Sequence, residues 1–180
     1  MLNDREILRK PESRHNRRNH RHKSPGSVLV VDVGGSNVKV LVSGRDVPRK
    51  VPSGRSLAAA VMVRRVLELA HDWDYDAVSI GYPGAVGADG PAREPKKNLG
   101  EGWVGFDFAA ASGKPVRVMN DAAMQALGGY QGGRMLFLGL GTSIGSALVS
   151  RRVIIPLELG PLPQRHGGTL AEVATAVPGC

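Results

Sequence analysis

The chain has 180 residues, of which 42% are hydrophobic and only 4% aromatic, so its length allows one ordinary domain or two small lobes with an aliphatic core. The sequence contains no apolar run of about 18 residues and no apolar segment typical of a signal peptide, so we expect neither a membrane span nor a secretory leader. The formal net charge is +8, but +5 of it lies in residues 1–25, which contain eight Lys or Arg and three acidic residues.

The basic N-terminal segment, residues 1–26, has few large aliphatic side chains to offset the entropy of ordering, so we predict that it is disordered. Such a segment can attract nucleic acids and other polyanions. The simpler interpretation is a solvated tail, or a stretch upstream of the true start of translation, and we expect no nucleic-acid partner. The single cysteine, Cys180, excludes an internal disulfide and favours a reducing cytoplasm.

The first half of the chain predicts strands followed by one helix. Two β-rich runs fill residues 28–42 and are joined by the turn sequence GGSN. A connection rich in Pro and Gly follows at 47–54, after which Ser56 is predicted to cap a helix over about 57–72. A short apolar strand is predicted at 77–84.

The second half is less regular until it repeats the opening pattern. Residues 85–105 are predicted to form loops, with a short helix at 106–112, a buried strand at 115–121 and a helix at 122–130. Residues 135–150 form a second strand, glycine turn and strand. The order β-β-β-α-β-α-β-α-β-β predicts a mixed α/β sheet that carries both glycine turns.

The first glycine turn follows a carboxylate at the end of an apolar strand. Gly34 and Gly35 let backbone N–H groups approach an anion, and Ser36 and Asn37 add side-chain donors. Asp32 would repel a phosphate unless Mg²⁺ lay between them. The segment therefore predicts either a metal-phosphate cradle or a plain hairpin turn.

Two further groups of polar residues end strands. Gly141, Thr142 and Ser143 form the second turn, which again is either a phosphate-binding turn or a hairpin. Asn120 and Asp121 close a buried strand where a helix opens. Judged alone, Asp121 is better explained as a helix N-cap than as a general base.

Three residues outside the turns are candidates for sugar binding. Asn98 offers a donor and an acceptor that suit a sugar hydroxyl. Trp103 either stacks on a sugar or anchors its loop, and we favour the anchor. Glu158 by itself is typical of an exposed acidic residue.

Together these motifs resemble the ROK family of sugar kinases within the actin-like ATPase superfamily, and more narrowly the bacterial polyphosphate glucokinases. The resemblance covers residues 27–162 in family order and rests on the segments VLVVDVGGSNVKVLVSG, SIGYPGAV, NLGEGWVGFDF, VMNDAAMQALGGY, MLFLGLGTSIGSALV and LELG. It implies an α/β protein with the actin-like ATPase (ribonuclease H-like) fold.

The resemblance also implies a role for each candidate residue. Asp121 would be the general base that accepts the proton of the glucose 6-hydroxyl, rather than a cap alone, and Asn98, Asn120, Asp121 and Glu158 would bind the sugar. The phosphate-binding residues would be Asp32, Gly34, Gly35, Ser36, Asn37, Gly141, Thr142 and Ser143. Asp32 would hold Mg²⁺ through water, and polyphosphate or ATP would donate the phosphoryl group to glucose or a related hexose. A cytoplasmic enzyme, compatible with a homodimer, is implied.

The sequence departs from the family in two places. Pro161 stands where family members usually carry a histidine that binds sugar, and the cysteine-rich zinc loop of many members is missing, so we expect no zinc site. Two other functions therefore stay open beside the kinase. One is a non-catalytic remnant of such an enzyme, and the other is a ROK-type transcriptional regulator that lacks its DNA-binding domain.

Motif and periodicity weaken towards the C-terminus, which suggests a kinase truncated within its second lobe. The expected divisions are a basic tail (1–26), an N-terminal lobe (27–121), the start of an incomplete second lobe (122–163) and an atypical tail (164–180). Without its covering helices, the second lobe would expose apolar strands, so we expect poor solubility or association with a partner.

Overall fold

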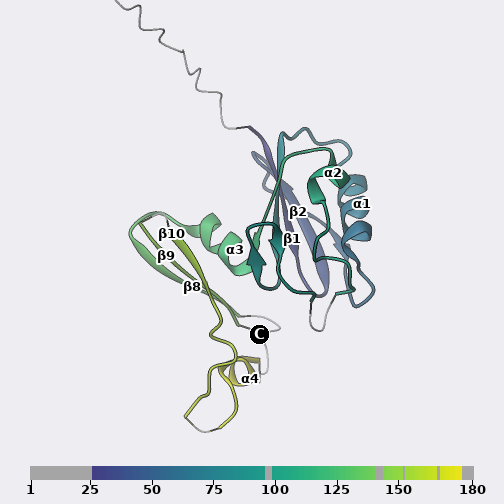
Figure 1. Cartoon of the computed structure of the whole chain (residues 1–180). Helices are drawn as coiled ribbons and strands as arrows, with labels where there is room; N and C mark the ends of the chain where they lie inside the picture. The colour runs from purple at the N-terminus through teal and green to yellow at the C-terminus, as the bar shows by residue number, and fades with distance from the viewer. Residues whose placement is uncertain (1–25, 96–98, 141–143, 152, 166, 176–180) are drawn as a thin grey trace, which may run out of the picture.

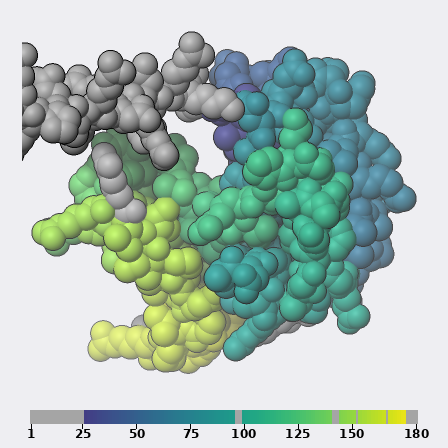
Figure 2. All heavy atoms as spheres, turned by 45° about the horizontal axis from the view of Figure 1, so that its top comes forward, coloured from purple at the N-terminus to yellow at the C-terminus, as the bar shows by residue number. Residues whose placement is uncertain are grey.

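The computed structural model describes residues 26–95, 99–140, 144–151, 153–165 and 167–175. Within them the chain forms a five-stranded sheet and a three-stranded sheet, with one helix, α3, between the two (Figure 1). In Figure 2 the yellow-green C-terminal part of the chain lies against the blue, teal and green part that contains the larger sheet.

The larger sheet has the strand order β3-β2-β1-β4-β7. Strands β1, β4 and β7 run parallel, whereas β2 and β3 each run antiparallel to the preceding strand. The strands are β1 (Val28–Val33), β2 (Asn37–Val42), β3 (Arg49–Pro52), β4 (Ala77–Tyr82) and β7 (Val116–Asn120). Because parallel strands place their carboxyl ends at one edge, Asp32, Tyr82 and Asn120 meet there.

Helices α1 (Ala59–Leu69) and α2 (Phe108–Ser112) cover one face of this sheet, and the aliphatic core lies between them and the strands (Figure 1). Trp103 is completely buried in this core, and its ring centroid lies 5.4 Å from that of Tyr82 and 6.3 Å from that of Phe108. Its side chain therefore anchors the loop before α2, as we expected, and is not available to stack on a sugar.

The smaller sheet has the order β10-β9-β8 and is covered on one face by helix α3 (Asp121–Gly129). Its strands are β8 (Arg134–Leu140), β9 (Ile144–Ser150) and β10 (Val153–Leu157). The face turned away from α3, which we call the outer face, carries large aliphatic side chains that are 46–64% exposed: Leu136, Leu138, Leu140, Val153 and Ile155. The expected exposure of apolar strands in this part of the chain is confirmed.

The remaining elements are short. Strands β5 (Val86–Gly87) and β6 (Gly90–Pro91) form a two-stranded ribbon, and helix α4 (Leu170–Thr175) follows the smaller sheet. In the part of the chain that the structure describes, no helix has the length and hydrophobicity needed to cross a membrane.

Three predictions of local structure were wrong. Residues 49–52, expected in a connection, form the edge strand β3. Ser56 does not cap α1, because Leu57 is buried in a turn closed by its N–H bond to the Gly54 carbonyl (2.9 Å) and the helix begins only at Ala59. The predicted single sheet is in fact two, since β8 and β9 pair with each other and with β10 and not with the larger sheet that contains β1 and β2.

Candidate functional site

The first turn connects β1 and β2 and is held tightly. The Gly34 N–H donates to the Asn37 carbonyl (3.0 Å), and the Ser53 hydroxyl donates to the Gly34 carbonyl (2.6 Å). A Cβ atom at Gly34 would lie 2.9 Å from the Asn37 oxygen, so a larger residue could not keep this turn. Asp32 is half-buried on the preceding strand, directly opposite Lys39.

Helix α3 begins at the carboxyl edge of the larger sheet, and Asn120 is its N-cap. The Asn120 side-chain oxygen accepts from the Ala123 N–H (3.1 Å), and its amide nitrogen donates to the Gly84 carbonyl (3.2 Å). The prediction that Asp121 caps the helix was therefore wrong. Asn120 thus satisfies the helix end, and the Asp121 carboxylate in the first turn accepts a local hydrogen bond from the Ala122 N–H (2.8 Å).

Glycines on both sheets allow the start of α3 to lie between them. A Cβ atom at Gly81 on β4 would lie 2.4 Å from the Met124 methyl carbon and 3.3 Å from the Asp121 Cα. One at Gly145 on β9 would lie 3.2 Å from the Ala122 Cβ. The absence of side chains at these two glycines thus places Asp121 close to both sheets.

Asp121 is partly buried and lies near two other carboxylates. Burial raises the pKa of its carboxyl group above the ordinary value, and the negative charges of Asp32 and Glu158 raise this pKa further, while the hydrogen bond from Ala122 opposes the rise. The three carboxylates, which are far apart in the sequence, therefore share one region of the fold. A carboxylate with a raised pKa in a cleft is suited to accept a proton.

Glu158 follows β10, and a buried serine fixes the backbone on both sides of it. The Ser146 hydroxyl, on a residue that is 1% exposed, donates to the Leu157 carbonyl (2.8 Å) and accepts from the Leu159 N–H (3.4 Å). The Glu158 side chain itself is exposed. This arrangement holds the carboxylate at the wall of the cleft without fixing its rotamer.

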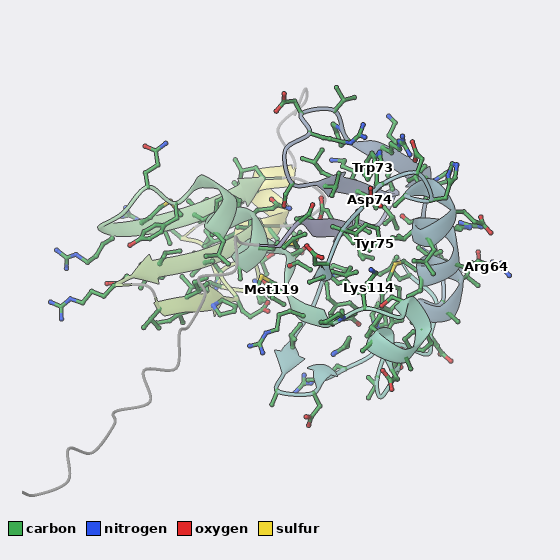
Figure 3. All side chains as sticks on the ribbon, turned by 90° about the horizontal axis from the view of Figure 1, so that it is seen from above. Arg64, Trp73, Asp74, Tyr75, Lys114 and Met119 are labelled. Atoms are coloured by element: carbon green, nitrogen blue, oxygen red, sulfur yellow. The ribbon has the colours of Figure 1, made fainter. Side chains whose placement is uncertain are left out.

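These features surround a cleft of about 540 Å³ between the two sheets. Its described lining comprises Gly34, Gly35, Lys39, Pro83, Gly84, Asn120, Asp121, Ala122, Gln125, Gly139, Leu140, Ile144, Gly145, Ser146, Leu157 and Glu158. The volume and the polar lining suit a small polar ligand. Figure 3 shows the labelled Met119, the residue before Asn120 on β7, at the same junction between the sheets.

The structure brings together some of the predicted site residues. Gly34, Gly35, Asn120, Asp121 and Glu158 line the cleft. Asp32 acts on Asp121 through its charge without lining the cleft, and Ser36 and Asn37 form the turn but do not line it either. The predicted residues Asn98, Gly141, Thr142 and Ser143 lie outside the described residues, as does the basic segment 1–25.

Sequence reasoning missed Lys39, Gln125 and Ser146, which line the cleft. Lys39 is the register partner of Asp32 and lies on the same face of the sheet. The alternation of side chains along residues 37–42 could have predicted this position from the sequence. Gln125 lies one helical turn after Asp121, where residues four apart share a face. The role of Ser146 depends on its distance to β10 and had no signal in the sequence.

Comparisons with known proteins were made for the whole chain. No protein-family model matches it. The bifunctional enzyme NanE/NanK of Brucella melitensis is 29% identical over 169 residues, which span 87% of this chain and 32% of that protein.

Among solved structures, the inorganic polyphosphate/ATP-glucomannokinase from Arthrobacter sp. strain KM matches with a TM-score of 0.65 and 22% identity, over 79% of this chain and 66% of that one. The ROK family glucokinase from Streptomyces griseus, solved with glucose and AMPPNP, matches with a TM-score of 0.57 and 24% identity, over 75% of this chain and 48% of that one. This chain therefore spans less than two thirds of the relatives that it matches. It has the actin-like ATPase fold of the ROK-family sugar kinases and corresponds to part of their length, as the sequence resemblance implied.

Proposed function

We propose that this chain forms the part of a sugar kinase that transfers a phosphoryl group from polyphosphate or ATP to the 6-hydroxyl of glucose or a related hexose. The observation that carries the proposal is the Asp121 carboxylate, which lines the cleft with its pKa raised by burial and by the charges of Asp32 and Glu158. The structural neighbours include a polyphosphate/ATP-glucomannokinase and a glucokinase bound to glucose.

In this proposal the sugar lies beside α3. Asp121 accepts the proton of the 6-hydroxyl while that oxygen forms a bond to the terminal phosphorus and the bond to the leaving phosphate breaks. Asn120, Glu158 and Asn98 bind the other hydroxyls. Asn120 also holds Asp121 in position, because its side chain is the N-cap of α3 and donates to the Gly84 carbonyl.

The phosphoryl donor lies on the glycine turns in this proposal. Backbone N–H groups of the turn that contains Gly34 and Gly35 would contact the phosphate, with Ser36 and Asn37 shaping the turn. The second turn, Gly141, Thr142 and Ser143, would contact it from the smaller sheet. Lys39, in the cleft beside Gly34 and Gly35, adds a positive charge that the sequence analysis did not assign.

The residues present fit a Mg²⁺ ion that is bound together with the donor. Among the described residues, no group of three or more His, Cys, Asp or Glu side chains could hold a metal ion by itself. Asp32 supplies one carboxylate, and Mg²⁺ in phosphoryl-transfer sites commonly uses one or two carboxylates together with phosphate and water oxygens. When bound, the ion would neutralise charge that develops on the phosphates.

The test is the formation of hexose 6-phosphate by the purified chain, with polyphosphate and ATP in separate reactions: glucose 6-phosphate when glucose is the acceptor and mannose 6-phosphate when mannose is. Asp121→Asn should lower the rate by about 10²–10⁴-fold if Asp121 is the general base. Asp89→Asn, an exposed position in the turn between β5 and β6, is the matched control and should keep the parent rate.

Calorimetric titration with glucose separates binding from transfer. Turnover that Asp121→Asn abolishes and Asp89→Asn keeps would support the proposal. Glucose binding without turnover would refute transfer by this chain alone, and the absence of both would refute the sugar site as well.

A further inference from the structure

Two of the three lysines that the structure describes lie directly opposite each other beside the cleft. Lys39 on β2 is the register partner of Lys50 on β3, and on its other side it is opposite Asp32 on β1. Residues opposite each other in neighbouring strands share a face of the sheet, so the three side chains form one row. Both lysines are exposed, and Lys39 lines the cleft beside Gly34 and Gly35.

Like charges that lie directly opposite in neighbouring strands repel each other, and the single carboxylate of the row, Asp32, can offset only one of the two lysines, so the row keeps an excess positive charge that an anionic ligand would neutralise. Among the described residues, neither lysine takes part in an ion pair. A lysine on an edge strand protects the edge from pairing with other chains, which is a sufficient reason for Lys50 alone. It does not explain why the next strand carries a second lysine at the same level.

The row of Asp32, Lys39 and Lys50 runs from β1 across β2 to the edge strand β3, and this direction indicates an elongated anionic ligand. A phosphate chain that leaves the turn at Gly34 and Gly35 across β2 and β3 would meet Lys39 first and Lys50 next. A triphosphate has its phosphates at the site of transfer, whereas a longer linear polyphosphate continues beyond it with one negative charge or more on each unit. Lys50, on the edge strand and beyond the lining of the cleft, would contact only the longer donor.

We propose that Lys50, together with Lys39, binds the part of an inorganic polyphosphate chain that extends beyond the site of transfer, and so selects long polyphosphate over short phosphoryl donors. This inference rests on the proposed function, since it takes the turn at Gly34 and Gly35 as the donor site. Lys50 is then a specificity residue for long polyphosphate, and Lys39 is a contact that long and short donors share.

The test is calorimetric titration of the full chain with long-chain linear polyphosphate and with tripolyphosphate, in the presence of Mg²⁺. The variants are Lys50→Gln, Lys39→Gln and the matched control Lys114→Gln. Lys114 precedes β7 at the opposite edge of the sheet, with its ammonium nitrogen 5.7 Å from the Tyr75 ring centroid, and both are labelled in Figure 3. The basic segment 1–25 is common to all variants, so differences between them report on the lysines.

Lys50→Gln should weaken the binding of long polyphosphate about three- to tenfold, the scale of one charge-assisted contact, and that of tripolyphosphate less than twofold. Lys39→Gln should weaken both, and Lys114→Gln neither. The added polyphosphate should also raise the melting temperature of the parent more than that of Lys50→Gln, because a ligand stabilises the form that it binds.

The proposal is overturned if Lys50→Gln and Lys114→Gln behave alike, if Lys50→Gln weakens both ligands equally, or if no variant binds polyphosphate. Binding and melting are measured without a sugar. Failure of the proposed transfer reaction therefore shows separately, as absent turnover in a chain whose polyphosphate binding still depends on Lys50.

Discussion

The two sheets differ in the side chains on the face opposite their main covering helices. In the larger sheet, the face under α1 and α2 holds the buried valines and leucine of β1 and β2, and the opposite face includes Asp32, Lys39 and Lys50. In the smaller sheet, α3 covers one face, and the outer face carries aliphatic side chains that are about half exposed. Helix α3 covers part of this opposite face of the larger sheet at Gly81, and the rest contributes to the cleft, whereas the outer face of the smaller sheet has the apolar composition of a surface that is usually packed.

This difference indicates that stability is concentrated in the larger sheet. Its core cluster contains many large side chains, including Trp103, whereas the buried residues of the second cluster are Ala123, Ala126, Ala147 and Val149. Because the apolar area removed from water sets the hydrophobic contribution, alanines contribute little to it. The cleft thus joins a well-packed sheet to a weakly packed one.

The largest expected effect comes from the core of the larger sheet. Trp103→Ala should lower the free energy of unfolding by about 3–5 kcal/mol, because it removes a completely buried ring and leaves a cavity between Tyr82 and Phe108. Urea unfolding followed by circular dichroism would measure it. Val104→Ala, at the exposed neighbouring position, should change the value by less than about 0.5 kcal/mol. Equal effects of the two would show that this sheet is not the stable part.

The second prediction concerns the packing of α3 on the smaller sheet. Ala126→Leu should destabilise by about 1–3 kcal/mol, since Ala126 is 0% exposed against β9 and has no space for three more carbons. Hydrogen exchange should show faster exchange in β8 and β9 with little change in β1 and β4. Uniform acceleration through both sheets would contradict the division between them.

The third prediction tests the cleft. Asp121→Asn should stabilise the chain near neutral pH, because the raised pKa of Asp121 means that folding disfavours the charged carboxylate. Below the ordinary pKa of an aspartate, Asp121 is protonated in both states and does not lower the free energy of unfolding. This destabilisation grows as the pH rises through the raised pKa of the folded state. Melting temperatures of the variant and the parent should therefore converge in acid and separate towards neutral pH. A variant less stable than the parent at neutral pH would argue against the anionic cluster.

The smallest change in stability is expected on the outer face of the smaller sheet. Leu138→Lys should alter the free energy of unfolding by less than about 0.5 kcal/mol, because Leu138 is already 52% exposed, and it should reduce the fluorescence of bound anilinonaphthalene sulfonate and slow aggregation. Phe137→Ala, at the adjacent position that packs against the α3 cluster, is the contrasting variant and should destabilise. An unchanged dye signal in Leu138→Lys would mean that the outer face is covered in solution.

Local patterns determined most of the secondary structure. β-rich runs on either side of glycine turns identified β1, β2, β8 and β9, and the apolar run before Asn120 identified β7. The prediction that Ser56 caps α1 was wrong because a serine beside an apolar run is a cap only if the helix starts there. Leu57, the next residue, is instead buried in a turn. Strand β3 was missed because Pro52 and Ser53 resemble a loop, although an edge strand tolerates proline.

What the sequence by itself determined is a set of candidate site residues and their order: a carboxylate before a glycine turn, an Asn-Asp pair where a strand meets a helix, and a later glutamate. What only the tertiary structure decided is which of them lie together. Asn120 rather than Asp121 caps α3, Ser146 holds the backbone around Glu158, and Lys39 joins the cleft opposite Lys50. These relations depend on distances between residues far apart in the chain, and hydrophobic periodicity and turn preferences report only on near neighbours.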